Sequence, residues 1–179
     1  HLVLRRQRQM CIRDRFKGDT VNLGVGQGYL SATPIQLAYY SAILANKGTI
    51  NKFSFVKKDS LEEPDKLISS NIDAYDWEKM HESMIGVIDN PKGTAGRLRS
   101  LKDYPIAAKS GTVELVSTET KEDYKIIREN EGNRDHAIII AFGPMPNPEY
   151  AVSVVIENGE SGGSVAGPVA IAVMNSLIN

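Results

Sequence analysis

The chain has 179 residues, of which 41% are hydrophobic and 24% are charged, with a formal net charge of −1. This composition fits one globular domain and excludes a disordered or collagen-like chain. The longest apolar run, residues 137–142, is far shorter than the roughly 20 residues of a membrane-spanning helix, and the single Cys11 excludes an intrachain disulfide.

The first 15 residues differ in kind from the rest of the chain. Residues 1–17 carry a net charge of +5, which leaves −6 for the remainder. Their arginines could form an arm for nucleic acid or an anionic membrane, but the stretch has no helical period and no aromatic ring on which a base could stack. Residues 8–15, RQMCIRDR, resemble a translated sequencing adapter. We therefore expect residues 1–15 to be a non-native tail that packs against nothing, and the domain to occupy residues 16–179.

Two helices are expected in the first half of the domain. Thr33, Pro34 and Gln36 form a capping box with proline at the first helical position, and Gly48 supplies a left-handed stop, so a helix should end near residue 47. A second helix should begin after Asp76 as its N-cap. Its apolar residues recur at spacings of three and four: Trp77, Met80, Met84 and Ile88.

The second half of the domain is expected to contain three strands and a terminal helix. Residues 106–116 indicate a strand interrupted only at Gly111, and the apolar runs 137–141 and 151–156 predict a hairpin. Residues 166–178, with Pro168 in the first turn, predict a largely buried helix. Between residues 117 and 135, ten of nineteen residues are charged, which indicates a solvated excursion rather than a binding tract. The expected order is helix, helix, strand, strand, strand, helix.

Three apparent site motifs fail on inspection. Residues 24–28, GVGQG, lack the third glycine of a dinucleotide loop and no strand is expected before them. His81 and Glu82 suggest a zinc-binding helix, but the second histidine would fall at Ile85. His136 opens an apolar strand and is interpreted as a boundary residue rather than a general base. We assign no metal site and no cofactor.

The motif that survives is Lys109-Ser110-Gly111-Thr112. A strand that carries a lysine, a hydroxyl and a glycine in a row can offer a charge, a hydrogen bond and bare backbone to a substrate with a carboxylate. By composition alone Lys-(Ser/Thr)-Gly would occur about 0.1 times in this chain, so the surrounding sequence must decide its meaning.

The surrounding sequence resembles the C-terminal part of the transpeptidase domain of class B penicillin-binding proteins, over about residues 16–179. Within that family it is most similar to the elongation-type peptidoglycan D,D-transpeptidases. The segments that carry the resemblance, in the order of the family, are residues 19–38 (DTVNLGVGQGYLSATPIQLA), 45–48 (ANKG), 90–96 (NPKGTAG), 108–112 (AKSGT), 157–159 (ENG) and 162–168 (GGSVAGP).

The family has two further motifs, Ser-x-x-Lys with the nucleophile and Ser-x-Asn. Residues 54–57 (SFVK) and 69–71 (SSN) match them, but about 0.9 matches to each are expected by chance, and residues 53, 55 and 57 alternate as on a strand rather than at a helix start. In the family both motifs precede the segment at residues 26–28. We therefore interpret both matches as decoys and expect the true motifs upstream of residue 16.

The resemblance implies an α+β fold, an antiparallel sheet with packed helices like that of penicillin-binding proteins and serine β-lactamases, to which the family adds two more strands. It also implies the roles of the site residues. Lys109 supplies positive potential, the Ser110 hydroxyl binds the substrate carboxylate, Gly111 lets the substrate backbone approach, and the Thr112 backbone N–H forms half of an oxyanion hole.

The implied activity is cross-linking of peptidoglycan stem peptides ending in D-Ala-D-Ala, through an acyl-serine that β-lactams also form, without cofactor or nucleic acid. The implied parent protein is anchored in the cytoplasmic membrane of a bacterium, with this domain in the cell envelope and a cell-wall elongation polymerase as its partner. Two alternatives stay open at this point: a β-lactam-hydrolysing or β-lactam-sensing protein of the same fold, and a non-catalytic binding or scaffold module.

Overall fold

A computed structural model describes residues 17–24, 26–27, 31–49, 54, 72–116 and 120–178. The chain forms two units, residues 1–32 and 33–179. In the first, the described residues include one helix, α2 (Lys17–Gly24). The expected tail at residues 1–15 and most of both decoy motifs lie outside the described residues, so these expectations stay predictions.

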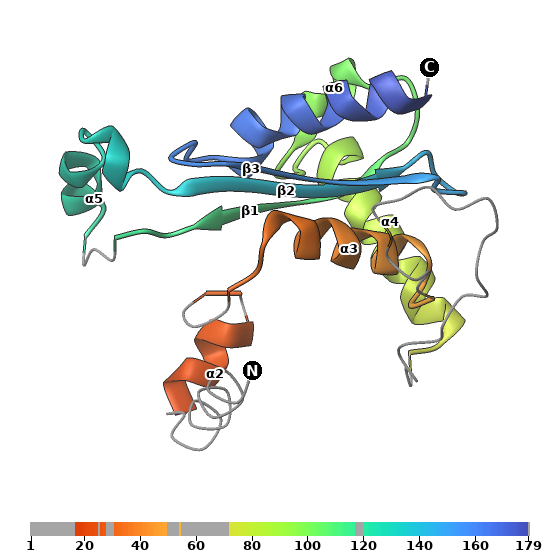
Figure 1. Ribbon diagram of the computed structural model, residues 1–179, viewed down its shortest axis with the longest axis horizontal. Helices are drawn as coiled ribbons and strands as arrows, with labels where there is room; N and C mark the ends of the chain where they lie inside the picture. Colours follow the sequence, from red (N-terminus) through yellow and green to blue (C-terminus); the bar gives the residue numbers. More distant parts are fainter. Residues whose placement is uncertain are drawn as a thin grey trace. The chain divides into compact units, whose positions relative to one another are not determined.

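The second unit is built on a three-stranded antiparallel sheet in the order β1 (Ala107–Val113), β2 (His136–Gly143), β3 (Tyr150–Ile156). Helix α3 (Pro34–Ala45) lies against one face of β2 and β3, and the terminal helix α6 (Gly167–Ile178) covers the opposite face (Figure 1). Helix α4 (Ala74–Asp89) passes beside β1. Helices packed on an antiparallel sheet are the α+β architecture that the sequence predicted.

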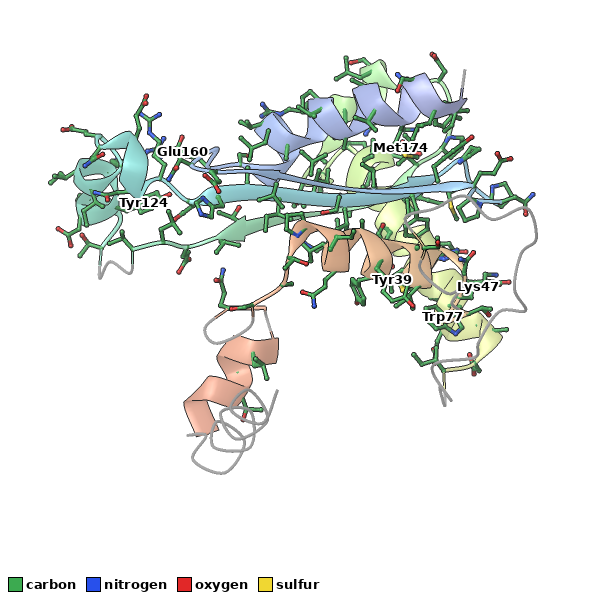
Figure 2. All side chains as sticks on the ribbon, in the orientation of Figure 1. Tyr39, Lys47, Trp77, Tyr124, Glu160 and Met174 are labelled. Atoms are coloured by element: carbon green, nitrogen blue, oxygen red, sulfur yellow. The ribbon has the colours of Figure 1, made fainter. Side chains whose placement is uncertain are left out.

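The core is divided by strand β2 into two apolar clusters. Ala137, Ile139 and Ala141 belong to the cluster under α6, together with Met174 of that helix (Figure 2), whereas Ile140 and Phe142 belong to the cluster under α3. Because side chains alternate along a strand, a strand buried on both faces must be apolar at nearly every position. This explains the continuous apolar run that predicted the hairpin, and the antiparallel β2–β3 pairing confirms it.

Helix α3 begins and ends as expected. The Gln36 N–H donates to Thr33 Oγ1 (3.3 Å) and the Thr33 N–H donates to Gln36 Oε1 (2.8 Å), which completes the capping box. Gly48 has a φ of +83° and its N–H donates to the Ile43 carbonyl, as a left-handed helix stop requires.

Helix α4 starts one turn earlier than the sequence analysis predicted, so the assignment of Asp76 as N-cap is wrong. The N-cap is Asp73, whose Oδ1 accepts the Asp76 N–H at 2.9 Å, and Asp76 lies in the first turn. An aspartate suits both positions because the N-terminal turn favours negative charge. The first turn, Ala74 and Tyr75, is exposed and therefore adds nothing to the apolar period that starts at Trp77.

Strand β1 continues through Gly111 without a break, contrary to expectation. Gly111 pairs with Ile138 in an unbroken register that runs from Ala107–Phe142 to Val113–His136. The strand is shorter than the expected residues 106–116 because the pairing stops at Val113. Gly111 therefore does not form a β-bulge in this strand.

The excursion after β1 contains structure that the sequence analysis missed, a short helix α5 (Lys121–Ile127) and a 3-10 turn η2 (Glu131–Asn133). Thr120 caps α5 by accepting the Asp123 N–H. The excursion is tied to the sheet by Asp135, which is only 5% exposed and accepts hydrogen bonds from the Tyr124 hydroxyl (2.5 Å) and the Leu115 N–H (3.3 Å). It is charged and surface-exposed, but it is anchored at its base.

Replacement of Tyr124 by phenylalanine should destabilise the chain, because the buried Asp135 carboxylate loses a donor, at a cost of about 1–3 kcal/mol. The hydrogen bond to Asp135, and then burial, raise the pKa of Tyr124 to about 12 from its usual 10.0. The folded state therefore favours the neutral phenol. Its stabilising effect should be fully present below pH 10 and be lost as the pH rises toward 12.

The measurement is chemical denaturation of the wild-type chain and the Tyr124→Phe variant at several pH values. Tyr75→Phe, a change at an exposed tyrosine of α4, is the matched control and should leave stability unchanged. A stability difference for Tyr124→Phe that stays constant from pH 7 to pH 12 would contradict the assigned role of the phenol.

Candidate active site

The surviving motif lies on β1, the outer strand of the described sheet. Ala107 belongs to the cluster under α3 and Ala108 to the cluster under α6. Because side chains alternate, Lys109 lies on the α3 side of the strand, and Ser110 and Thr112 lie on the α6 side. The register with β2 fixes this arrangement, since Lys109 pairs with Ile140 and Ser110 with Ile139.

Ser110 meets a second hydroxyl from a distant part of the chain. The Thr94 and Ser110 hydroxyl oxygens are 3.0 Å apart. Thr94 belongs to the loop that follows α4. In this loop the Ala95 N–H donates to the Val87 carbonyl, and Asn90 accepts the Lys92 N–H on its side chain and the Gly93 N–H on its carbonyl. The sequence analysis gave Thr94 no role. Its contact spans 16 residues and leaves no local pattern.

A third segment, the π-helical turn η3 (Gly162–Ala166), packs directly on both of these elements. A Cβ atom on Gly162 would lie 2.1 Å from the Ile138 carbonyl oxygen and 2.6 Å from that of Gly111. A Cβ on Gly163 would lie 2.6 Å from the Thr94 carbonyl oxygen. Glycine at these two positions is therefore required for the backbone of η3 to contact the strand and the loop.

Gly111 is different, because the packing of the described residues does not require glycine there. A Cβ at Gly111 would lie 3.6 Å from Ile138 Cβ, which is an ordinary van der Waals contact, and the residue pairs in a regular strand. The packing of the described residues thus gives no reason for glycine at this position, and the missing side chain leaves bare backbone on the strand. Bare backbone on a strand suits the close approach of an extended ligand.

The two remaining motif residues are polar and exposed. Lys109 is exposed, and its Nζ donates to the Ser110 carbonyl at 2.6 Å. The Thr112 hydroxyl donates to the Glu160 carbonyl at 3.4 Å. The strand therefore presents a cation, hydroxyl groups and a residue without a side chain along four consecutive positions, a combination suited to a peptide that carries a carboxylate.

The residues that the sequence analysis set aside have structural contacts. His81 Nε2 lies 2.8 Å from the Leu44 carbonyl oxygen and the ring packs on Phe142, so this histidine joins α4 to α3 and the sheet. His136 Nδ1 accepts the Asn158 N–H at 2.9 Å. The described element that leads into residues 24–28 is helix α2, whereas a dinucleotide-binding loop follows a strand. No described helix is long and apolar enough to span a bilayer.

Comparison with known proteins identifies the family of this chain. The family model described as penicillin binding protein transpeptidase domain matches residues 6–175. The peptidoglycan D,D-transpeptidase MrdA of Haemophilus influenzae is 34% identical over 174 residues, which cover 93% of this chain and 27% of that protein. The chain thus spans about a quarter of the length of this relative.

Solved structures show the same likeness. The crystal structure of Pseudomonas aeruginosa PBP2 in complex with WCK 5153 is 36% identical, with a TM-score of 0.72, over 95% of this chain and 35% of that chain. PBP2 of Helicobacter pylori, in its complex with MreC, is 25% identical with a TM-score of 0.68, over 90% of this chain and 27% of that chain. The model match, the MrdA relative and these folds together show that the chain belongs to the penicillin binding protein transpeptidase domain family, and within it to the PBP2/MrdA type.

Proposed function

We propose that residues 16–179 are the C-terminal part of the transpeptidase domain of a bacterial peptidoglycan D,D-transpeptidase, in which the strand Lys109–Thr112 binds the substrate, and that residues 1–15 are a non-native tail. The observation that carries this proposal is the bare backbone at Gly111. It is flanked by Lys109 and by the Ser110–Thr94 hydroxyl pair, and the described packing does not require glycine there.

The reaction of such an enzyme is acyl transfer through a serine. The serine Oγ attacks the carbonyl carbon between the two D-Ala residues and gives up its proton, the C–N bond breaks, and the leaving D-Ala amine takes up that proton, which leaves an acyl-serine ester. The amine of a second stem peptide then attacks the ester carbonyl and forms the new amide bond, while its proton returns to the released serine Oγ. We place the serine and the Ser-x-Asn motif upstream of residue 16, so this chain supplies the side of the site that holds the substrate.

Each residue of the strand has a role in that step. Lys109 supplies positive potential toward the substrate carboxylate and the proton network of the serine, and Ser110, oriented by Thr94, donates a hydrogen bond to the carboxylate. Gly111 admits the substrate backbone. The Thr112 N–H is one of two donors to the oxyanion, and the loss of one such donor costs about 3 kcal/mol in other acyl-transfer enzymes.

The partners of the parent protein follow from the same proposal. The substrate is a peptidoglycan stem peptide ending in D-Ala-D-Ala, and β-lactams acylate the same serine. We place the domain outside the cytoplasmic membrane, on a parent anchored in that membrane, beside the polymerase of cell-wall elongation. The names of the relatives, one of them solved with MreC, support a place in the envelope.

A labelled penicillin tests the proposed reaction. On the full-length protein, we expect one covalent label on a serine upstream of residue 16, mapped by peptide mass spectrometry, and no label on Ser54. Stable labelling of Ser54, or a full-length protein that takes up no penicillin, would overturn the proposal.

Replacement of Lys109 by alanine in the full-length protein should lower the penicillin acylation rate by a factor of about ten to a hundred with little change in thermal midpoint. Hydrogen bonds to charged groups are worth about 1.5–3 kcal/mol, whereas an exposed lysine contributes little to packing. Lys125→Ala, at an exposed lysine of α5, serves as control. A loss of rate within about threefold, or one matched by a large fall in midpoint, would argue against the site.

The two glycines that meet at the strand should respond differently to alanine. Gly111→Ala should keep its thermal midpoint, because the new Cβ meets only ordinary contacts, and should lose most of its acylation rate, because the methyl group occupies the path of the substrate. Gly162→Ala should lower the midpoint as well, since its Cβ would collide with two carbonyl oxygens. If Gly111→Ala is acylated at the wild-type rate, the substrate does not cross this backbone.

A further inference from the structure

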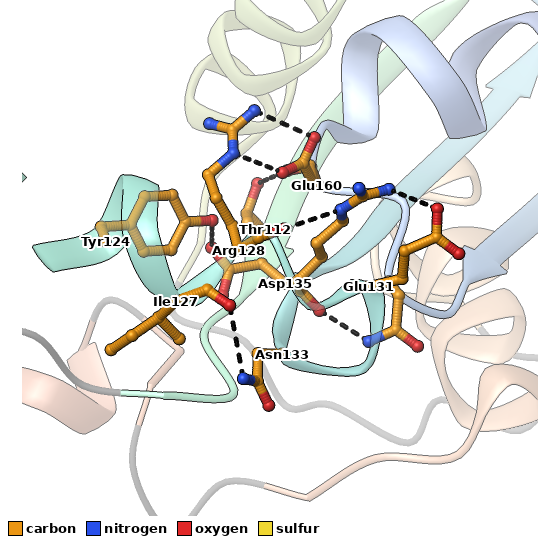
Figure 3. Close-up of polar contacts among 10 residues, drawn as sticks. Thr112, Tyr124, Ile127, Arg128, Glu131, Asn133, Asp135 and Glu160 are labelled. Carbon is orange, nitrogen blue, oxygen red and sulfur yellow. Dashed lines mark hydrogen bonds and ion pairs between the residues drawn. The ribbon is translucent and has the colours of Figure 1, made fainter. Parts of the chain in front are cut away.

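The loop after β3 returns to the candidate site at Thr112. Residue 160 of this loop accepts the Thr112 hydroxyl on its backbone carbonyl at 3.4 Å, and its backbone N–H donates to the Asp135 carbonyl at 2.8 Å. Two residues further on, Gly162 packs on the Gly111 backbone. The position of Glu160 is therefore coupled directly to the strand that carries the motif (Figure 3).

The backbone conformation at Glu160 is unusual for a residue with a side chain. Its φ is +62°, and that of Asn158 is +56°. A left-handed conformation is unfavourable for a non-glycine residue and persists only where other contacts impose it. For Asn158 those contacts are visible, because its N–H donates to His136 Nδ1 (2.9 Å) and its side-chain amide donates to the Arg134 carbonyl (2.8 Å).

For Glu160, the side chain is held from the excursion by Arg128. Arg128 Nη2 donates a hydrogen bond to Glu160 Oε2 at 3.3 Å, and Nε lies 2.9 Å from Oε1 in the same ion pair. The guanidinium also lies over the Tyr124 ring, 5.7 Å from its centre. The planar fork of arginine matches a carboxylate in a way that lysine cannot reproduce.

This ion pair is too exposed to contribute much to stability. The side chains of Arg128 and Glu160 are 44% and 30% exposed, and ion pairs at the surface contribute little to the free energy of unfolding. The ion pair nevertheless includes a hydrogen bond to Oε2 of the residue whose backbone carbonyl accepts the Thr112 hydroxyl. A role in orientation accounts for this better than a role in folding.

We propose that Arg128 and Glu160 are positioning residues for the active site: their ion pair holds the left-handed backbone of Glu160 so that its carbonyl fixes the Thr112 hydroxyl, and with it the direction of the Thr112 N–H. The inference rests on the proposed function, which places that N–H at the oxyanion. Neither side chain is assigned a contact with substrate. The segment that contains α5 and Arg128 thus affects the rate of the reaction only through Glu160.

The test is the rate of penicillin acylation of the full-length protein, measured beside its thermal midpoint. Arg128→Ala and Glu160→Gln should each lower the rate by a factor of about three to ten, with midpoints close to wild type, since the ion pair contributes orientation rather than stability. Arg128→Lys, which keeps the charge and loses the fork, should fall between Arg128→Ala and wild type. Glu131→Gln is the matched control. It removes an ion pair with Arg134 within the same excursion and should leave the rate unchanged.

A double-mutant cycle with Thr112→Val tests whether Arg128 affects the acylation rate through the Thr112 hydroxyl or by another route. Thr112→Val removes the hydroxyl that Glu160 accepts and keeps the backbone N–H. If Arg128 acts through that hydroxyl, Arg128→Ala should cause no further loss of rate in the Thr112→Val background, because interacting residues are not additive. The expected coupling equals the whole effect of Arg128→Ala.

The outcomes distinguish this inference from the proposed function. Equal losses from Arg128→Ala in both backgrounds, a loss from Glu131→Gln of the same size, or a midpoint that falls in parallel with the rate would overturn the positioning role. An acylated wild type whose rate is unaffected by Arg128→Ala would also overturn it while leaving the proposed function intact. A wild-type protein that is not acylated would overturn the proposed function itself.

Discussion

The burial of β2 on both faces is the constraint on which the rest of the described structure depends. Its side chains alternate between the cluster under α6 and the cluster under α3, so a shift of pairing by one residue would exchange the two sets. The small residues Ala137 and Ala141 and the large Phe142 could not trade places without voids and clashes. The register of β1 is fixed as a consequence, and with it the opposite faces on which Lys109 and Ser110 lie.

Local signals predicted most of the fold. The capping box at Thr33, the stop at Gly48 and the apolar runs of β2 and β3 each describe interactions within a few residues, and all of them are present. The N-cap of α4 was misplaced because its first turn is exposed and carries no apolar period. Helix α5 was missed because charge dominates its sequence, although Thr120 and Asp123 form a local cap.

The candidate site could be predicted only where its residues are adjacent in the sequence. Residues 109–112 carry a motif and a family resemblance, and the predicted strand is present. The roles of these residues in substrate binding are proposed. Thr94 lies in a segment that carries the resemblance but received no role, and Arg128 and Glu160 gave no signal. The contacts of Thr94 with Ser110 and of Thr112 with Glu160 join residues 16 and 48 positions apart, and the ion pair of Arg128 with Glu160 spans 32. These pairings depend on the sheet and on the close packing of η3, so the sequence alone does not show which residues meet.

Helix α5 also shortens the loop that the chain must close when β1 pairs with β2. The entropy of loop closure grows with the logarithm of loop length, and a segment that is already ordered counts as fewer freely rotating residues. The bond between Tyr124 and Asp135 spans only 11 residues and can form before the strands meet. This hydrogen bond would then bring His136 close to Val113, its partner in the last pair of the β1–β2 register. The charged excursion therefore lowers the entropy cost of closing the loop between β1 and β2.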